Sequence, residues 1–271
     1  MAKRLLSDDL WTRIEPLLPP LKPRRFRFPG RKPLTNRQAL TGILFVLRTG
    51  VRWNDLPCEL GCGSGSACRK RLQEWQRLGV WDTLHRMLLG ELDQASKIDW
   101  SRAAVDSSSV RALGGGEETG PNPTDRGRPG SKQHAVVDAD GVPLAATLTG
   151  ANVPDVNELT EVVDDVGPTG GKVGRPRRRP DVLYGDRGYD SEPHREEMRR
   201  RGIDPKLAKR RTGHGSGMGK YRWVVERFFA WLHRYRRLRL RTDWYAGNHE
   251  AMLKLACCLI CLNYLLGTAL T

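Results

Sequence analysis

Three carboxylates in this chain have the type and spacing needed to hold divalent cations. Asp106 and Asp186 each end a short apolar run, "AAVD" and "DVLYGD", that predicts a β-strand. A carboxylate just past a strand lies at the rim of a sheet, where α/β folds gather their ligands. Glu226 follows from a predicted helix. Two strand-end aspartates and one helical glutamate can hold two metal ions about 3.5–4 Å apart for in-line phosphoryl transfer.

The segment around Glu226, "GKYRWVVERFFAWLHRYRRLRLR", predicts an amphipathic helix. Its buried face is expected to consist of Val225, Phe228, Phe229, Leu232 and Tyr235. Glu226 lies on the adjoining arc with Arg222, His233 and Arg237, which suits a metal ion facing a phosphate. The alternative is an internal ion pair between Glu226 and Arg222, four residues apart. Taken alone, each aspartate is better explained as a turn or cap residue, so the specific signal is the ordered trio.

The charge of the chain is unevenly distributed. Its 271 residues include 46 Lys and Arg against 31 Asp and Glu, a net charge of +15. Residues 1–37 (10 basic, 3 acidic) and 172–241 (22 basic, 8 acidic) are basic, whereas residues 91–171 (6 basic, 14 acidic) are acidic. This pattern predicts a polyanion bound at the flanks and cations held in the middle. On composition alone, a solvated basic surface or binding to a membrane surface are the alternatives.

Residues 1–96 are predicted to form a small all-helical domain with a basic, proline-rich arm. The expected helices cover residues 7–18, 36–48, 64–78 and 80–95. Short Gly-containing links and the basic helix "SACRKRLQEWQRLG" favour a helix-turn-helix-like DNA-binding module. Arg69, Lys70 and Arg71 are its candidate DNA contacts. A plain helical bundle with a solvated basic face is the alternative.

Residues 97–271 are predicted to form an α/β domain. Three strands, helix, strand, helix, strand and helix are expected over 103–112, 131–138, 142–150, 155–166, 181–186, 191–201, 203–209 and the Glu226 segment. This is the order of elements in the ribonuclease-H-like fold, in which the first and fourth strands are neighbours. Asp106 would then lie beside Asp186. Only 40 residues separate Asp186 from the helical glutamate, which leaves no room for an inserted domain.

Several remaining segments have plain structural interpretations. Polar, Gly- and Pro-rich loops are expected over 114–130 and 167–180. Residues 251–270 approach transmembrane length, but Lys254 and Asn263 interrupt them, which favours a buried helix. The cysteine cluster of a Gly-rich turn (Cys58, Cys62 and Cys68) has no nearby His and makes a poor zinc site. No long apolar stretch opens the chain, so no signal peptide is expected.

Several motifs together resemble a DDE transposase of the insertion sequence five type, from a bacterial insertion element. The matching pieces are "TGVRWNDLP", "DSSSVRA", "GSKQHAVVDADGVPLAATLTGANVPD", "YGDRGYDS" and "RWVVERFFAWLHRYRRL". The last fits most of a family signature, Tyr, two residues, Arg, three residues, Glu, six residues, Lys, through Arg222 and Glu226. Gly219 holds the tyrosine place, and His233 holds the lysine place with Arg234 beside it.

The resemblance implies a transposase that binds the terminal inverted repeats of its element and cleaves and joins DNA strands. Asp106, Asp186 and Glu226 would be the catalytic and metal-binding residues. Carboxylate oxygens prefer hard cations, so two Mg²⁺ ions are expected, with Mn²⁺ as a substitute. Water and then a DNA 3′-hydroxyl would be the nucleophiles. The expected partners are double-stranded DNA and further copies of the chain, in the cytoplasm at the nucleoid and away from membranes.

Basic side chains around the trio and on the third helix are the expected DNA contacts. They are Arg222, His233, Arg234, Arg237, Arg69, Lys70, Arg71 and Lys132. Arg222 would face a phosphate through paired hydrogen bonds. Lys132 and His134 open a strand next to the expected site. Asn152 and Asp155, in "GANVPD", match a family segment, although a turn role explains them equally well.

Two other functions fit parts of the sequence. A non-catalytic DNA-binding descendant of a transposase should have lost one of the three carboxylates, and this chain has all three. A metal-dependent nuclease of the same fold would carry the same trio. The basic N-terminal segment favours recognition and joining of DNA ends over plain hydrolysis.

Overall fold

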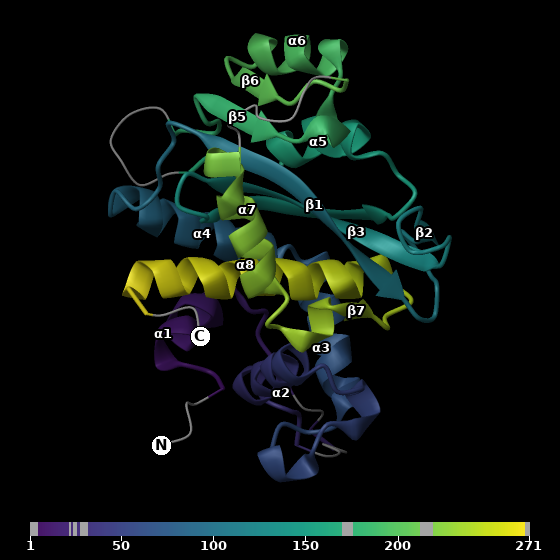
Figure 1. Ribbon diagram of the computed structural model, residues 1–271. Coiled ribbons are helices and arrows are strands. Elements are labelled where there is room, and N and C mark those ends of the chain that lie inside the picture. The colour runs from purple at the N-terminus through teal and green to yellow at the C-terminus, as the bar shows by residue number, and fades with distance from the viewer. Residues whose placement is uncertain are drawn as a thin grey trace.

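A seven-stranded mixed sheet forms the centre of the computed structural model (Figure 1). The structure describes residues 5–21, 23, 26–27, 32–169, 176–211 and 219–268. The strands are β1 Ala103–Ala112, β2 Gly120–Pro121, β3 Pro129–Asp138, β4 Pro143–Gly150, β5 Val182–Gly185, β6 Asp204–Leu207 and β7 Leu240–Arg241. The longer strands lie in the order β4-β3-β1-β5-β6, while β2 pairs with β3 and β7 pairs with β1.

Strand directions follow from the connections. β3 runs antiparallel to β1, and a tight hairpin joins β3 to the antiparallel β4. β5 is parallel to β1 and β6 is parallel to β5, because the helices α5 (Asp155–Asp164) and α6 (Glu192–Arg200) return the chain between them. The first and fourth long strands are therefore neighbours. This confirms the strand order predicted from the sequence.

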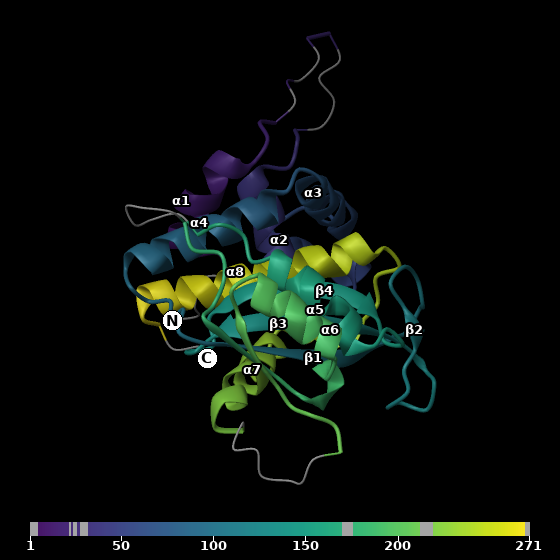
Figure 2. The same ribbon diagram turned by 90° about the horizontal axis from the view of Figure 1, so that it is seen from above.

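Helices cover both faces of the sheet. α7 (Gly219–Leu232) and α8 (Ala246–Leu266) pack against one face and α5 packs against the other. The view from above in Figure 2 shows α5 lying over the sheet. This double cover buries every residue of β3 except Pro129. Because successive side chains of a strand point to opposite faces, Asp106 of β1 points toward α7 and Ser107 toward α5.

Four α-helices precede the sheet, close to the predicted positions. They are α1 Asp8–Ile14, α2 Asn36–Thr49, α3 Gly65–Arg77 and α4 Val80–Gln94. Side chains cap three of them: Ser7 begins α1, Ser64 begins α3, and Thr35 forms a capping box with Gln38 at α2. Short 3-10 turns complete the chain at Glu15–Leu17, Trp53–Asp55, Cys58–Leu60, Arg187–Tyr189 and Arg236–Leu238.

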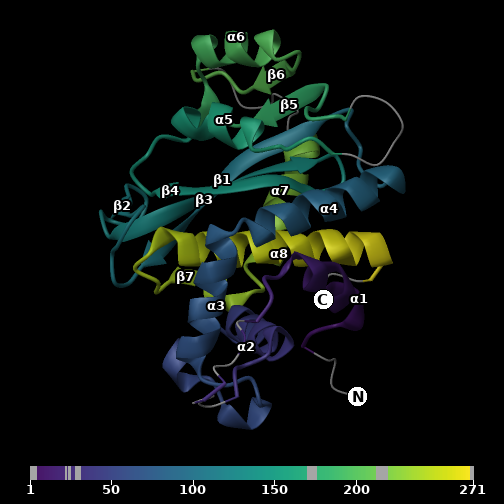
Figure 3. The same cartoon turned by 180° about the vertical axis from the view of Figure 1, so that it is seen from behind.

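α8 lies between the sheet and the helices α1, α2 and α3 (Figure 3). It contacts α3 and α4 on one side and β4 on the other. The buried apolar side chains of the helices and the sheet form one continuous cluster. The division of the chain at residue 96 stays a prediction.

Among the described helices, α8 alone is long and apolar enough to cross a membrane. Its most apolar 18-residue window is 67% buried inside the protein. The side chains that make it apolar, such as Leu255 and Ile260, belong to the common core. The structure thus agrees with the sequence interpretation of a buried C-terminal helix.

The structure differs from the sequence interpretation at three places. The predicted loop over 114–130 contains β2, and the two-residue strand β7 was not expected. α7 ends at Leu232, so residues after it leave the helical arc on which they were predicted. Parts of the basic loop over 167–180, including Arg175, lie outside the described residues.

Candidate active site

Asp106 and Asp186 lie at the rim where β1 and β5 run side by side. The parallel register pairs Ala104 with Tyr184, and two residues further along each strand direction stand the two aspartates. β5 ends at Gly185, so Asp186 begins the turn that follows the strand, whereas Asp106 lies within β1. The sequence prediction that these two carboxylates meet at one rim agrees with the register.

Asp106 is strongly influenced by its surroundings. Burial, with a smaller contribution from the nearby charge of Asp186, raises the pKa of its carboxyl to about 6 against the opposing effect of the Arg222 guanidinium. The backbone N–H of Ser107 donates to Asp106 Oδ1 at 2.8 Å. A carboxylate that is buried beside a second carboxylate is one that a cation would stabilise, so this pair fits a hard divalent ion.

Arg222 reaches the site from the first turns of α7. Its guanidinium donates to Asp106 Oδ2 at 2.9 Å, and both side chains are only 19% exposed. The structure therefore contains an ion pair between Arg222 and Asp106 in place of the alternative pair between Arg222 and Glu226. Arg222 Nε is buried without a hydrogen-bond partner among the described residues, so the fork retains an unused donor.

Glu226 lies one helical turn after Arg222, and its side chain is exposed to solvent. Within the described ranges, no three His, Cys, Asp or Glu side chains converge closely enough to hold a metal ion. The three predicted carboxylates are therefore arranged as a close aspartate pair and a glutamate on the neighbouring helix. Because Arg222 of this helix already touches Asp106, α7 places Glu226 on the side of the sheet that Asp106 faces.

The turn after β5 is built around Asp186. Its Oδ1 accepts the backbone N–H of Gly188 at 2.7 Å and so begins the 3-10 turn Arg187–Tyr189. Tyr189 is fully buried, and its hydroxyl has no hydrogen-bond partner among the described residues. Burial raises the pKa of this phenol well above its usual value, and so do the negative charges of Asp155, Asp106 and Asp186. The hydroxyl therefore stays protonated and lies near three carboxylates.

Asp155 joins this site, a role that the sequence left open. Its Oδ1 accepts hydrogen bonds from Lys132 Nζ and from Ser107 Oγ, both at 2.8 Å. The motif "GANVPD" and the lysine of β3 were the signals for it, but sequence could not distinguish a turn residue from a site residue. Asn152, by contrast, lies in the turn before α5 and its side chain packs against Gly120.

The side chains of Lys132 and His134 lie on the face of β3 that α5 covers. The Lys132 side chain is 11% exposed, and its ammonium is taken up by Asp155 and by the carbonyl of Val153 at 2.6 Å. Lys132 was predicted to contact DNA, but in the structure its ammonium is nearly buried and is engaged by these two protein groups. His134 is buried with Nε2 2.8 Å from Thr149 Oγ1, and burial lowers its pKa to about 4.

The basic residues after α7 have separate environments. His233 is half-buried, with Nε2 3.1 Å from Gln133 Oε1, and Arg234 is exposed. Arg237 is buried: its side chain is 3% exposed and pairs with Asp243 at 2.9 Å. The prediction that Arg237 contacts DNA on the Glu226 arc is wrong, because the helix ends five residues earlier and the guanidinium turns into the core.

The Arg237–Asp243 pair should be structural. Asp243→Ala is expected to lower the free energy of unfolding by about 3–5 kcal/mol, because it leaves a buried guanidinium without its partner. The matched control is Asp55→Ala, which removes an exposed partner of Arg52 and should cost about 1 kcal/mol or less. Urea unfolding followed by circular dichroism measures both. Equal midpoints for the two variants would contradict the structural role.

The three predicted DNA contacts of the N-terminal segment lie on α3. Arg69 and Lys70 are exposed, while Arg71 is half-buried and pairs with Glu74 at 3.1 Å. Leu72 and Trp75 form the buried side of the same helix. The exposed side of α3 is thus basic, as both the DNA-binding interpretation and the solvated-bundle interpretation require.

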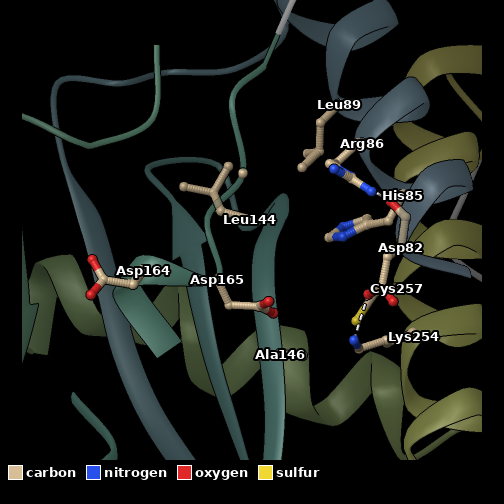
Figure 4. Close-up of a pocket in the computed structure, with 11 residues that line it drawn as sticks. Asp82, His85, Arg86, Leu89, Leu144, Ala146, Asp164, Asp165, Lys254 and Cys257 are labelled. Atoms are coloured by element: carbon tan, nitrogen blue, oxygen red, sulfur yellow. Dashed lines mark hydrogen bonds and ion pairs between the residues drawn. The ribbon is translucent and has the colours of Figure 1, made fainter. Parts of the chain in front are cut away.

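A polar cavity of about 360 Å³ lies away from this site, between α4, α8 and β4 (Figure 4). Lys254 pairs there with Asp82, and His85 Nε2 lies 2.9 Å from the carbonyl oxygen of Pro143. Burial lowers the pKa of His85 to about 4 and raises that of the nearby Asp165. None of the predicted site residues lines this cavity, so the rim of β1 and β5 remains the candidate site.

The strand order and the covering helices define a mixed α/β protein with an acidic rim where β1 and β5 run side by side. Residues 101–261 match the transposase DDE domain, and residues 6–85 match the putative transposase of the IS4/5 family. The chain belongs to the DDE transposase family. This confirms the resemblance to a transposase of an insertion element that the sequence motifs indicated.

Three individual proteins are similar to this chain. The putative transposase for insertion sequence element IS402 of Burkholderia cepacia is 63% identical over 151 residues, which cover 56% of this chain and 72% of the relative. The insertion element IS402 uncharacterized 16.2 kDa protein of Burkholderia cepacia is 63% identical over 123 residues, which cover 45% of this chain and 84% of that relative. The crystal structure of the Mos1 strand transfer complex aligns with a TM-score of 0.36 at 10% identity, over 86% of this chain and 78% of that one.

Proposed function

We propose that this protein binds the terminal inverted repeats of an insertion element and cleaves and joins DNA strands by metal-assisted phosphoryl transfer. The observation that supports the proposal is the register that brings Asp106 and Asp186 to one rim, with Arg222 of α7 bound to Asp106 and Glu226 one helical turn further along that helix. Family membership supports the reaction class. Double-stranded DNA and further copies of the chain are the proposed partners, in the cytoplasm at the nucleoid.

Asp106, Asp186 and Glu226 would hold two Mg²⁺ ions, or Mn²⁺ in their place. Bound there, the ions would activate the attacking oxygen and stabilise the leaving oxygen of an in-line displacement. The protein's own contribution is to orient the carboxylates: the Ser107 N–H fixes Asp106, and the Gly188 N–H fixes Asp186. Because Asp106 is buried, the dielectric constant around it is lower than that of water. The charge interactions that Asp106 makes are therefore stronger than they would be in water.

Arg222 would bind the phosphate that is cut or the one next to it. Its guanidinium is planar and can form two parallel hydrogen bonds to a phosphate. In the DNA-free structure this fork is occupied on one side by Asp106. A cation on the aspartates would therefore release the fork for DNA, so the two events should support each other.

A cleavage and joining assay tests the proposal. The purified protein is incubated with Mg²⁺ and a DNA duplex that carries one end of the element, with a chelator in the control reaction. Metal-dependent nicking at the end followed by joining to a target duplex is expected. Hydrolysis without joining would favour a plain nuclease, and end binding without either reaction would favour a non-catalytic descendant.

The affinity for DNA should fall steeply with salt concentration, because the exposed basic side chains of α3 are expected to neutralise DNA phosphates. Arg69→Ala with Lys70→Ala, in the full chain, is expected to weaken binding and to reduce the slope of log affinity against log salt by about 0.9 for each phosphate that the variant no longer neutralises. The control is Arg199→Ala, which removes one exposed cation from α6 at the other end of the molecule (Figure 1). Gel shifts at several salt concentrations measure the slope. An unchanged slope in the double variant would favour the solvated-bundle interpretation of α3.

A further inference from the structure

We infer that Asp155 is a positioning residue that sets the spacing between Asp106 and Asp186. It does so by tying the strand that carries Asp106 to the turn that begins at Asp186. The inference rests on the proposed function, because the spacing of these carboxylates matters only if they share cations.

One oxygen of Asp155 holds the strand. Oδ1 accepts from Ser107 Oγ at 2.8 Å, and Ser107 donates its own backbone N–H to Asp106 Oδ1 at 2.8 Å. Because Asp106 and Ser107 leave β1 on opposite faces, the strand edge is held from both sides, by Arg222 over one face and by Asp155 over the other. The position of the Asp106 carboxylate is therefore coupled to Asp155 through a single neighbouring residue.

The other oxygen of Asp155 faces the turn. A methyl group on Gly188 would come within 3.0 Å of Asp155 Oδ2 and 2.9 Å of Asp186 Oδ1. Both carboxylates thus border the space that a side chain on this glycine would occupy, and the N–H of the same glycine donates to Asp186 Oδ1 at 2.7 Å. Gly188 has no positive φ, so the demand for glycine here is steric and comes from these two carboxylates.

Lys132 keeps Asp155 in place. Its ammonium donates to Asp155 Oδ1 at 2.8 Å and to the carbonyl of Val153 at 2.6 Å, with only 11% of its side chain exposed. Asp155 is also the first residue of α5, where a negative charge is favoured by the helix dipole. The carboxylate is thus paired with a lysine and lies at the first residue of a helix that packs on the sheet.

A second observation points to the same place. The buried hydroxyl of Tyr189, on the residue after Gly188, has no hydrogen-bond partner among the described residues and lies near Asp155, Asp106 and Asp186. An unpaired buried donor is costly, so this hydroxyl, whose pKa the three aspartates influence, marks a polar place next to the turn that an acceptor could complete.

Mn²⁺ binding to the full-length, DNA-free protein tests the inference without relying on activity. Gly188→Ala and Asp155→Asn are each expected to weaken Mn²⁺ binding, followed by electron paramagnetic resonance of the free ion, by roughly tenfold to a hundredfold. Cleavage should then require more Mg²⁺ and should recover in part when Mg²⁺ is raised, whereas DNA affinity should stay within about threefold of the parent. Lys132→Met should behave like Asp155→Asn, and Lys132→Arg should keep most of the Mn²⁺ affinity because it keeps the cation.

Matched variants separate positioning from general damage. Gly114→Ala adds the same methyl group where no atom lies within 4 Å, and Asp164→Asn removes a paired carboxylate from the other end of α5. Both should bind Mn²⁺ like the parent. Melting curves establish that each variant is folded, and Asp155→Asn carries the test if Gly188→Ala is not.

The outcomes distinguish the inference from the proposed function. If the parent binds Mn²⁺ and cleaves DNA while Gly188→Ala and Asp155→Asn match it in both, the inference is wrong and the proposed function stands. If the two variants lose Mn²⁺ affinity no more than Gly114→Ala and Asp164→Asn do, the inference is equally wrong. A parent that neither binds Mn²⁺ nor cleaves would overturn the proposed function, and the inference with it.

Discussion

Each of Asp106→Asn, Asp186→Asn and Glu226→Gln should lower the rate of strand cleavage by at least roughly a hundredfold to a thousandfold, the usual effect of removing one preorganised charge-stabilising group. The amide keeps the shape of the side chain but removes the charge that a metal ion requires. Because residues that act as a unit are not additive, the triple variant should be little worse than any single one. Cleavage of end-containing DNA in Mg²⁺ measures the effect.

The structure predicts different stabilities for these three variants. Glu226 is exposed, so Glu226→Gln should melt with the parent. Asp106→Asn leaves the half-buried Arg222 without its ionic partner and should melt lower. The control for the helical position is Glu196→Gln, an exposed glutamate of α6 that should retain full activity. Near-normal cleavage by any one of the three amide variants would remove that residue from the site.

Arg222→Lys should reduce cleavage by roughly tenfold to a hundredfold, as expected for a weakened electrostatic contact to the reacting group. DNA affinity should change little, because lysine keeps the charge and loses only the bidentate fork. Single-turnover cleavage and gel shifts on the same DNA measure the two effects separately. The larger effect on cleavage is the signature of a residue that acts on the cut phosphate.

Arg227→Lys provides the matched control on the same helix. Arg227 lies over the rings of Trp223 and Trp231 and donates to the carbonyl of Asp140, on the part of α7 that does not touch Asp106. It undergoes the same chemical change without affecting the aspartate pair. If Arg222→Lys cleaves at the rate of Arg227→Lys, Arg222 serves only to neutralise Asp106.

Much of the fold could be predicted from local sequence patterns. The buried apolar start of β1, the caps at Ser7 and Ser64, and the positions of the helices follow from patterns that are visible in the chain. The neighbouring position of β1 and β5 followed from the order of elements. The short strand β7 could not be predicted, because two residues contain no periodicity and the pairing depends on the distant end of β1.

The site was only partly predictable for a related reason. A sequence shows which residues can carry charge, but it does not show which of them form ion pairs in the folded protein. Arg222 and Glu226 have the spacing of a helical ion pair, yet Arg222 pairs across 116 residues with Asp106. Arg237 lies in a basic segment, as an exposed DNA contact would. Because α7 ends at Leu232, however, the Arg237 side chain is buried and pairs with Asp243. Both differences arise from tertiary packing.

The position of α8 has a consequence for where DNA would be cut. This one helix contacts α3 and α4 on one side and β4 on the other, so the basic face of α3 and the acidic rim are parts of a single packed body. No flexible joint is then needed to relate the two surfaces. If α3 binds DNA and the rim cleaves it, the distance between the two would be fixed. The number of base pairs between the bound sequence and the cleaved bond would then be constant.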